Sequence, residues 1–139
     1  MTESPSARLL QGGCQCGAVR YAVADAFVYA LNCHCSRCRR ATGSAFKPLG
    51  GIERHRVRLT QGTDRVLVVG DDACHDVRCG TCGSLLYSIV REGAWAHVAY
   101  GSLDEAPSLR PTVHIHVASK APWFDITDGL PQFPEFESP

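Results

Sequence analysis

The sequence predicts a single domain that is mainly β, with one short helical segment. The chain has 139 residues, a length typical of one domain, and 45% of them are hydrophobic, which is enough to fill one core. Short runs of β-branched and aromatic residues recur along it, many of them with alternating apolar positions. Glycine, aspartate and proline separate these runs, as turns between strands require. We expect two small sheets or a partly open barrel, and the strand patterns alone leave the topology open.

The predicted elements follow the chain in order. We expect a loose polar lead-in over residues 1–11, one domain over residues 12–134 and a short tail over residues 135–139. The runs that predict strands are residues 18–23, 27–32, 57–62, 65–70, 84–90, 95–101 and 113–118.

Residues 36–43, with the sequence SRCRRATG, form the segment predicted to be helical. Ser36 is a residue type that favours the N-cap position of a helix, and Gly43 is one that favours its C-terminal stop. The sequence therefore predicts one or two helical turns between them.

The charge balance excludes several classes of function. Lys and Arg number 14, as do Asp and Glu, so the formal net charge is zero, which disfavours binding to nucleic acid or to a membrane surface. No apolar run approaches the roughly 18–20 residues that a membrane span needs. The N-terminal sequence also lacks the basic start and apolar stretch of a signal peptide. We therefore expect a cytoplasmic protein with no nucleic-acid or membrane partner.

Eight cysteines are the most informative feature of the composition. A reducing cytoplasm makes structural disulfides unfavourable, so metal binding is the leading explanation for them. The CxxC pair Cys79 and Cys82 resembles a zinc knuckle, with Gly80 and Gly83 relieving the tight backbone. Zinc prefers four ligands in a structural site, and the glycine-flanked CxC pair, Cys14 and Cys16, is the natural second donor pair. A redox dithiol is the competing interpretation of the CxxC pair, without the βαβ context that such a motif requires.

Cys33, Cys35 and Cys38 then remain as a set of three. A zinc site with three protein ligands keeps one position open for water or substrate. His34 is an alternative fourth ligand, but in an extended segment its side chain points away from the face that Cys33 and Cys35 share. Another alternative is that the three cysteines are buried and metal-free.

Three further residues are considered as ligands. Cys74 is expected to be a small apolar residue of the core, with a spare metal ligand as the alternative. His114 and His116 alternate along a predicted strand on one face, which would suit a metal. Two such histidines are more often surface or hydrogen-bonded residues.

Four segments carry the most specific pattern of the sequence: GGCQCGAVRY (12–21), CHCSRCRRATGSAF (33–46), CGTCGSLL (79–86) and HIHVASKAPWFDITDGLPQF (114–133). By these segments and their order, the chain resembles the glutathione-dependent formaldehyde-activating (GFA) family, which includes centromere protein V. The resemblance implies a β-tent fold and two zinc ions. It implies a structural zinc on Cys14, Cys16, Cys79 and Cys82, and a second zinc on Cys33, Cys35 and Cys38.

The same resemblance implies a reaction. The family's named activity adds glutathione to formaldehyde and forms S-(hydroxymethyl)glutathione, which is carbon–sulfur lyase chemistry. The candidate cations for the carboxylates of glutathione are Arg37, Arg39, Arg40 and Lys47, with a solvated basic face as the alternative. The three arginines would also offset the negative charge of three thiolates on one zinc.

Other functions are compatible with the same motifs. One is a non-enzymatic zinc module that binds a protein, with a fourth protein ligand closing the second site. Another is an enzyme with the same metal chemistry and a different thiol or aldehyde. The sequence leaves a homodimer open.

Overall fold

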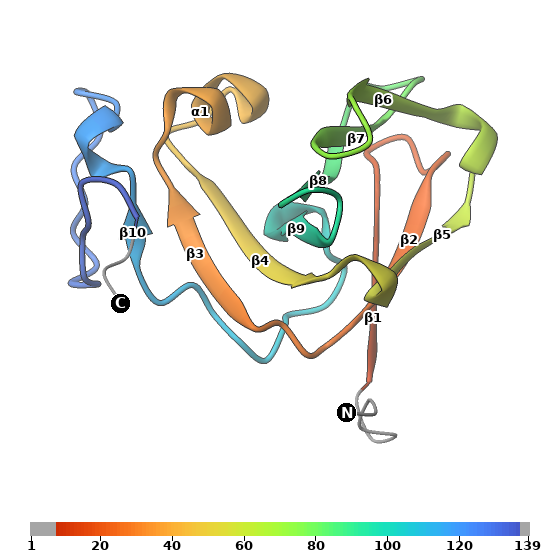
Figure 1. Ribbon diagram of the computed structural model, residues 1–139, viewed down its shortest axis with the longest axis horizontal. Helices are drawn as coiled ribbons and strands as arrows, with labels where there is room; N and C mark the ends of the chain where they lie inside the picture. The colour runs from red at the N-terminus through yellow and green to blue at the C-terminus, as the bar shows by residue number, and fades with distance from the viewer. Residues whose placement is uncertain (1–7, 137–139) are drawn as a thin grey trace.

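Two β-sheets pack face to face around the main core in residues 8–136, the part of the chain that the computed structural model describes (Figure 1). A second, smaller buried cluster is formed by Cys33, Leu49, Val113 and Ile115. The larger sheet has the strand order β10-β3-β4-β9-β8-β7-β6, and the smaller has the order β1-β2-β5. All neighbouring strands are antiparallel except β10 and β3, which are parallel. This architecture confirms the mainly β class predicted from the sequence.

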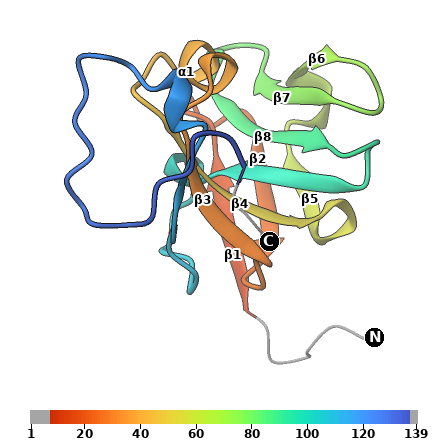
Figure 2. The same ribbon diagram turned by 60° about the vertical axis from the view of Figure 1, so that its left-hand side comes forward.

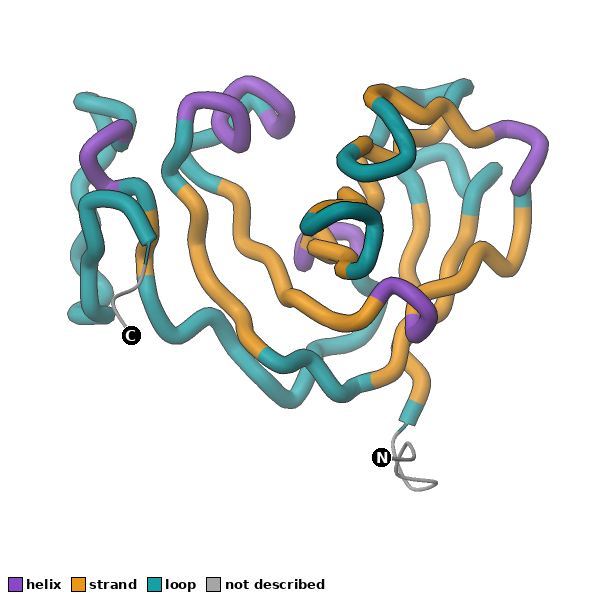
Figure 3. Tube along the Cα trace, viewed as in Figure 1, coloured by secondary structure: helices purple, strands orange, loops and turns teal. Residues whose placement is uncertain are grey.

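The strands are β1 (Leu9–Gly13), β2 (Arg20–Ala24), β3 (Tyr29–Cys33), β4 (Lys47–Glu53), β5 (Val57–Gln61), β6 (Val66–Gly70), β7 (His75–Cys79), β8 (Leu85–Val90), β9 (Trp95–Ala99) and β10 (His114–Ile115). The helices are α1 (Ser36–Thr42) and four single 3-10 turns, η1 (Arg54–Arg56), η2 (Thr63–Arg65), η3 (Tyr100–Ser102) and η4 (Val117–Ser119). Figure 3 shows that helix is confined to short segments, which lie between strands except for η4, after the last strand. None of these helices is long and apolar enough to cross a lipid bilayer.

The core lies between the two sheets and uses alternate residues of their strands. Tyr21 and Val23 of β2 belong to the same buried cluster as Ile52 of β4, Ile89 of β8 and Val98 of β9. Because successive side chains of a strand point to opposite faces, the residues between these positions face the other side of the larger sheet. That second face carries the candidate site. Figure 2 shows β6, β7 and β8 as successive strands across this sheet.

Three strands lie where the sequence predicts none. β1 begins at Leu9, inside the predicted lead-in, because its residues pair along their whole length with β2. β4 contains Pro48, Gly50 and Gly51, which weaken a strand pattern, yet it is a central strand between β3 and β9. The third, β7, carries polar residues in alternation with buried ones. Residues 1–7 of the predicted lead-in lie outside the described residues.

The predicted strand over residues 113–118 is reduced to two residues. β10 ends at Ile115 because His116 adopts a left-handed conformation with φ of 56°, and η4 follows. The chain then returns alongside β10, where the Phe133 amide donates to the carbonyl of His114 and the His114 amide donates to that of Pro131. The prediction that His114 and His116 share a strand face is therefore wrong. The last three residues of the predicted tail are outside the described part of the chain.

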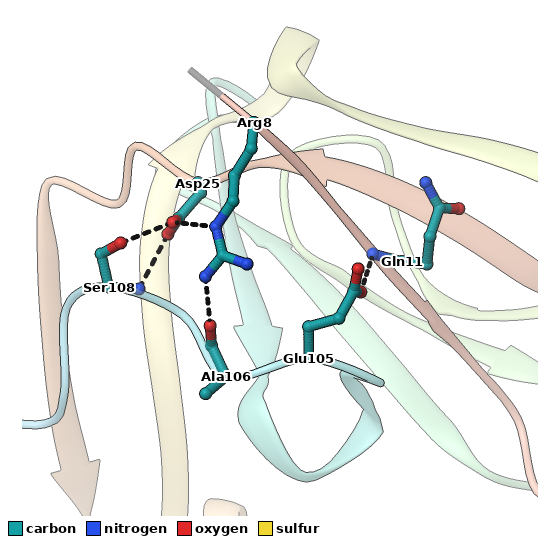
Figure 4. A network of polar contacts seen from close by, with 6 residues as sticks. All are labelled: Arg8, Gln11, Asp25, Glu105, Ala106 and Ser108. Atoms are coloured by element: carbon teal, nitrogen blue, oxygen red, sulfur yellow. Dashed lines mark hydrogen bonds and ion pairs between the residues drawn. The ribbon is translucent and has the colours of Figure 1, made fainter. Parts of the chain in front are cut away.

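A polar cluster fastens the start of β1 to the loop after η3 (Figure 4). The carboxylate of Asp25 accepts hydrogen bonds from Arg8 Nε at 2.9 Å and from the Ser108 amide at 2.9 Å. Arg8 also donates to the carbonyl of Ala106, at 2.6 Å. Burial would raise the pKa of Asp25, but the hydrogen bonds from the hydroxyl and amide of Ser108 and from Arg8 lower it. The cluster closes the end of the smaller sheet against this loop.

Candidate metal centres

The first candidate centre is a cluster of four thiols. Sγ atoms of Cys14, Cys16, Cys79 and Cys82 all lie within 4.8 Å of one another. Two of the separations, Cys14 to Cys16 and Cys16 to Cys79, are 3.7 Å. A tetrahedral ion with metal–sulfur bonds of about 2.3 Å places its sulfurs roughly 3.8 Å apart, so these four thiols fit a zinc-sized ion. The donor pairs that the sequence assigned to one site thus meet in space.

Backbone amides support these thiols. The amides of Thr81 and Cys82 each donate to Cys79 Sγ at 3.4 Å, and the Val19 amide donates to Cys14 Sγ at 3.2 Å. Such donors stabilise thiolates. Hydrogen bonds from Ser84 lower the pKa of Cys82 to about 5, which favours the ionised form that a metal requires.

The glycines of this turn have different roles. Gly83 has a φ of 81°, as predicted for a tight knuckle turn. Gly80 does not belong to the residues with positive φ, so it relieves the tight backbone in a different way. Its amide donates to the carbonyl of Arg65 at 2.7 Å, and a Cβ there would come within 2.7 Å of that oxygen. Gly80 is therefore required by close backbone approach.

The second candidate centre is a cluster of three thiols, formed where β3 ends and α1 begins. Sγ atoms of Cys33, Cys35 and Cys38 lie within 4.8 Å of one another, and within residues 8–136 no His, Asp or Glu joins this cluster. The hydrogen bond that Cys38 makes to Cys33 lowers the pKa of Cys33, and the same contact together with burial raises the pKa of Cys38. Three thiols in one such cluster can hold one cation, which matches the set predicted from spacing.

The helix geometry itself depends on one of these cysteines. Cys35, and not the predicted Ser36, is the N-cap of α1, because its sulfur accepts a hydrogen bond from the Cys38 amide at 3.2 Å. Gly43 ends the helix in a left-handed conformation with φ of 63°, as predicted. The cap brings the sulfurs of Cys35 and Cys38 to the same side of the first turn.

His34 lies away from the thiols and is fully buried. Its Nε2 is 2.8 Å from His114 Nδ1, and His114 Nε2 is 2.8 Å from the carboxylate of Asp128. Its ring packs against Phe46, with the centroids 4.9 Å apart. Burial and the neighbouring His114 lower the pKa of His34 to about 4. His34 thus connects the three-cysteine segment to β10 through His114, which in turn contacts Asp128.

Lys47 is the cation placed directly beside the three-cysteine cluster. It pairs with Cys33 across β3 and β4 and is buried. Its Nζ donates to the hydroxyl of Ser88 at 3.1 Å, and that hydroxyl donates to the carboxylate of Asp76 at 2.6 Å. The charge of Lys47 opposes the rise in the pKa of Cys38, so it favours a thiolate there. Lys47 can offset the negative charge of three thiolates on one divalent ion.

A cavity of about 560 Å³ adjoins the three-cysteine cluster, and two of its wall residues are Cys33 and Cys38. It lies on the face of the larger sheet opposite the core, along β3. Other wall residues are Tyr29, Arg91, His97 and His116. A second cavity, of about 600 Å³, lies between α1 and the four-cysteine cluster and is lined in part by Lys47, Arg78 and Cys14. The three-cysteine cluster alone faces the first cavity.

The predicted substrate-binding arginines lie outside both cavity walls. Arg37 and Arg40 are exposed on α1, and Arg39 Nε donates to the carbonyl of Ser119 at 3.1 Å. Lys47 lines the second cavity. A role for these four residues in substrate binding stays a prediction.

Cys74 belongs to neither thiol cluster. It is exposed in the turn between β6 and β7, where its amide donates to the Asp71 carboxylate at 2.9 Å. The prediction of a core position is therefore wrong, because the apolar run of β6 ends at Gly70 and the chain reverses direction before β7.

Sequence patterns missed most of the first cavity's wall. Tyr29 lies four residues before Cys33 on the same face of β3, and this period-two spacing was the available signal. Arg91 and His97 reach the cavity through the pairing of β4, β8 and β9, which no local pattern reveals. The Tyr29 hydroxyl and His97 Nε2 are 2.5 Å apart, across Gly51. Burial lowers the pKa of His97 to about 4, so this ring is neutral at pH 7.

We expect Gly51→Ala to destabilise the protein by about 1–3 kcal/mol, because a Cβ at this position would lie 2.1 Å from Cζ of Tyr29. The displaced ring would also lose its hydrogen bond to His97. Urea denaturation measures the change. Gly101→Ala is the matched control, since a Cβ there meets no atom within 4 Å. Equal midpoints for the two variants would show that the Tyr29 ring does not depend on Gly51.

Comparison with known proteins adds three findings. A family model described as glutathione-dependent formaldehyde-activating enzyme matches residues 9–119. A relative from Halomonas elongata, provisionally named as a glutathione-dependent formaldehyde-activating enzyme, is 28% identical over 137 residues, covering 85% of this chain and 81% of the relative. A crystal structure of a Rhodobacter sphaeroides protein matches with a TM-score of 0.58 at 23% identity, covering 70% of this chain and 91% of that chain. This last likeness concerns the fold alone.

Proposed function

Because the chain belongs to the glutathione-dependent formaldehyde-activating enzyme family, we propose that it is a zinc-dependent carbon–sulfur lyase that joins a thiol to a small aldehyde. The observation that carries this proposal is the contrast between the two thiol clusters. Four cysteines form a complete ligand set, whereas three cysteines form an incomplete one that opens on a cavity of about 560 Å³. Open metal sites of enzymes have this incomplete form.

We assign a structural zinc to Cys14, Cys16, Cys79 and Cys82, and a second zinc to Cys33, Cys35 and Cys38. A zinc ion at the second set supplies Lewis acidity, which favours the thiolate form of a bound thiol and polarises a carbonyl group. We also propose that the protein is cytoplasmic, since the reducing conditions there keep cysteines such as these eight free thiols reduced.

The reaction needs no other reactant. The sulfur of the thiol forms a bond to the aldehyde carbon, the carbonyl π bond breaks, and the proton of the thiol ends on the resulting hydroxyl. The chain contributes by holding the thiol and the aldehyde next to each other in the cavity, so that their reaction no longer depends on a chance encounter in solution. Lys47 contributes its buried positive charge beside Cys33, where it favours negative charge on sulfur.

Cobalt substitution tests the proposal. We expect glutathione at millimolar concentration to strengthen the sulfur-to-cobalt charge-transfer band of the cobalt-loaded protein, because an added thiolate completes the three-cysteine set. Product formation is then measured above the uncatalysed rate, since thiols add to formaldehyde readily without help. A spectrum that no thiol changes would contradict the proposal and support a non-enzymatic zinc module.

A further inference from the structure

The cavity beside the three-cysteine cluster follows β3 from one end to the other. Cys33, Leu31 and Tyr29 lie on one face of this strand and all three line the cavity. At about 3.3 Å per residue, the Cα atoms of Cys33 and Tyr29 are roughly 13 Å apart. The cavity is therefore long enough to hold an extended molecule with one end at the thiols.

The middle of this cavity is apolar. Leu31 and Leu49 face it from the paired strands β3 and β4, and Val90 and Ile115 line it from β8 and β10. None of these side chains can form a hydrogen bond. The middle of the bound molecule should therefore be hydrocarbon.

The far end of the cavity carries a positive charge. The guanidinium carbon of Arg91 lies 5.2 Å from the centroid of the Tyr29 ring and 5.1 Å from that of Trp95, within the range of cation–π contacts. Within residues 8–136, none of the ion pairs involves Arg91. The two rings hold the guanidinium in place, and no carboxylate within the described residues forms an ion pair with it.

Two histidines also line this wall. His97 shares a hydrogen bond with Tyr29 and is neutral at pH 7, because burial lowers its pKa to about 4. The ring of the other, His116, packs against that of Phe136 with the centroids 4.9 Å apart. Arg91 is thus the permanent cation of the wall.

We propose that the thiol substrate of this site is an apolar chain with a single carboxylate at its far end, an ω-mercapto acid of roughly six carbons. The sulfur lies at Cys33 and Cys38, the hydrocarbon lies along Leu31 and Leu49, and the carboxylate pairs with Arg91. This inference rests on the proposed function and names the substrate class of the same site.

Glutathione and formaldehyde fit this wall less well. Glutathione has two carboxylates, an ammonium group and two peptide groups, and an apolar wall would leave several of them without partners. Formaldehyde has one carbon and one oxygen and would fill a small part of about 560 Å³. It can be the second reactant, but it does not explain the length of the cavity.

The test titrates cobalt-loaded protein with 6-mercaptohexanoate, with 6-mercaptohexanol as its neutral counterpart, and with glutathione. We expect the acid to bind at least about 10-fold more tightly than either of the others, measured by the charge-transfer band. Arg91→Asn should remove the difference between acid and alcohol. Asparagine is chosen because residue 91 has a φ of 54°, which Asn tolerates. Arg58→Asn, on the exposed side of β5, should leave the difference unchanged.

A second measurement does not depend on the metal. Hexanoate, which has no thiol, should change the fluorescence of Trp95 in a Trp123→Phe background, because its carboxylate would approach the stacked Arg91. Trp123 is 71% exposed and can be replaced without disturbing the core. This measurement also applies to the protein with Arg91 intact, if Arg91→Asn fails to fold.

The outcomes separate the two proposals. If hexanoate changes Trp95 fluorescence while no thiol changes the cobalt spectrum, the cavity binds an apolar acid and the proposed lyase function is wrong. If glutathione binds cobalt-loaded protein as tightly as 6-mercaptohexanoate and Arg91→Asn has no effect, the lyase function survives and this substrate class is overturned. No response of Trp95 to hexanoate would also overturn it.

Discussion

Cys79→Ser should lower the free energy of unfolding by more than about 4 kcal/mol, with a fall in the midpoint of thermal unfolding of roughly 10–15 °C. The sulfur of Cys79 is fully buried, accepts two backbone amides and lies 3.7 Å from that of Cys16. Its loss would leave three ligands for the proposed zinc ion, which would join β7 and the turn after it to the turn after β1. Calorimetry together with metal analysis measures both effects.

Cys74→Ser is the matched control. It makes the same chemical change at an exposed thiol outside both clusters, so its effect should stay within about 0.5 kcal/mol. If Cys79→Ser were no more damaging than Cys74→Ser, the four-cysteine cluster would not be a structural metal site.

Cys35→Ser should have the opposite profile: it removes one metal ion and leaves the fold. Serine is a favoured N-cap residue, so its hydroxyl can replace the sulfur that accepts the Cys38 amide. The thiolate ligand is lost, and two cysteines remain at an already incomplete site. We expect the metal content to fall by one ion per chain. The midpoint of thermal unfolding should be close to that of the unmodified protein after the metal has been removed from its three-cysteine cluster.

Cys35→Ala separates the two roles of this residue. It removes both the ligand and the cap, so it should be less stable than Cys35→Ser by about 0.5–2 kcal/mol, with the same metal content. A larger loss of stability from Cys35→Ser than from Cys79→Ser would mean that the structural and the open sites are assigned the wrong way round.

The sequence was most informative where chemistry depends on local spacing. The CxC and CxxC pairs and the cysteine triple predicted both thiol clusters, because ligands that share an ion must be brought together by tight turns. Strands with β-branched residues, such as β6 and β8, were also predicted close to their observed bounds. The short helix was predicted with its correct glycine stop at Gly43.

Features that depend on pairing between distant segments were not predictable. β4 was missed because Gly50 and Gly51 weaken its strand pattern, although aromatic rings fill the space beside both glycines. Cys74 could not be placed without knowing that β6 and β7 form a hairpin. Arg91 lies in the turn between β8 and β9, and it reaches the cavity because β9 pairs with β4. Its place in the cavity wall therefore depends on the strand order of the sheet, which the local sequence does not reveal.

Alternation along the strands of the larger sheet has a consequence for divergence among relatives. On β9, His97 faces the cavity, and its neighbours Ala96 and Val98 pack in the core between the sheets. On β4, Leu49 faces the cavity and Ile52 packs in that core. A substitution at His97 changes the shape and polarity offered to a substrate without opening a void in the core between the sheets, whereas Leu49 also packs in a smaller buried cluster with Cys33, Val113 and Ile115. Members built on the same two cysteine clusters can therefore acquire different substrate preferences through single exchanges, while selection for folding acts on the intervening positions.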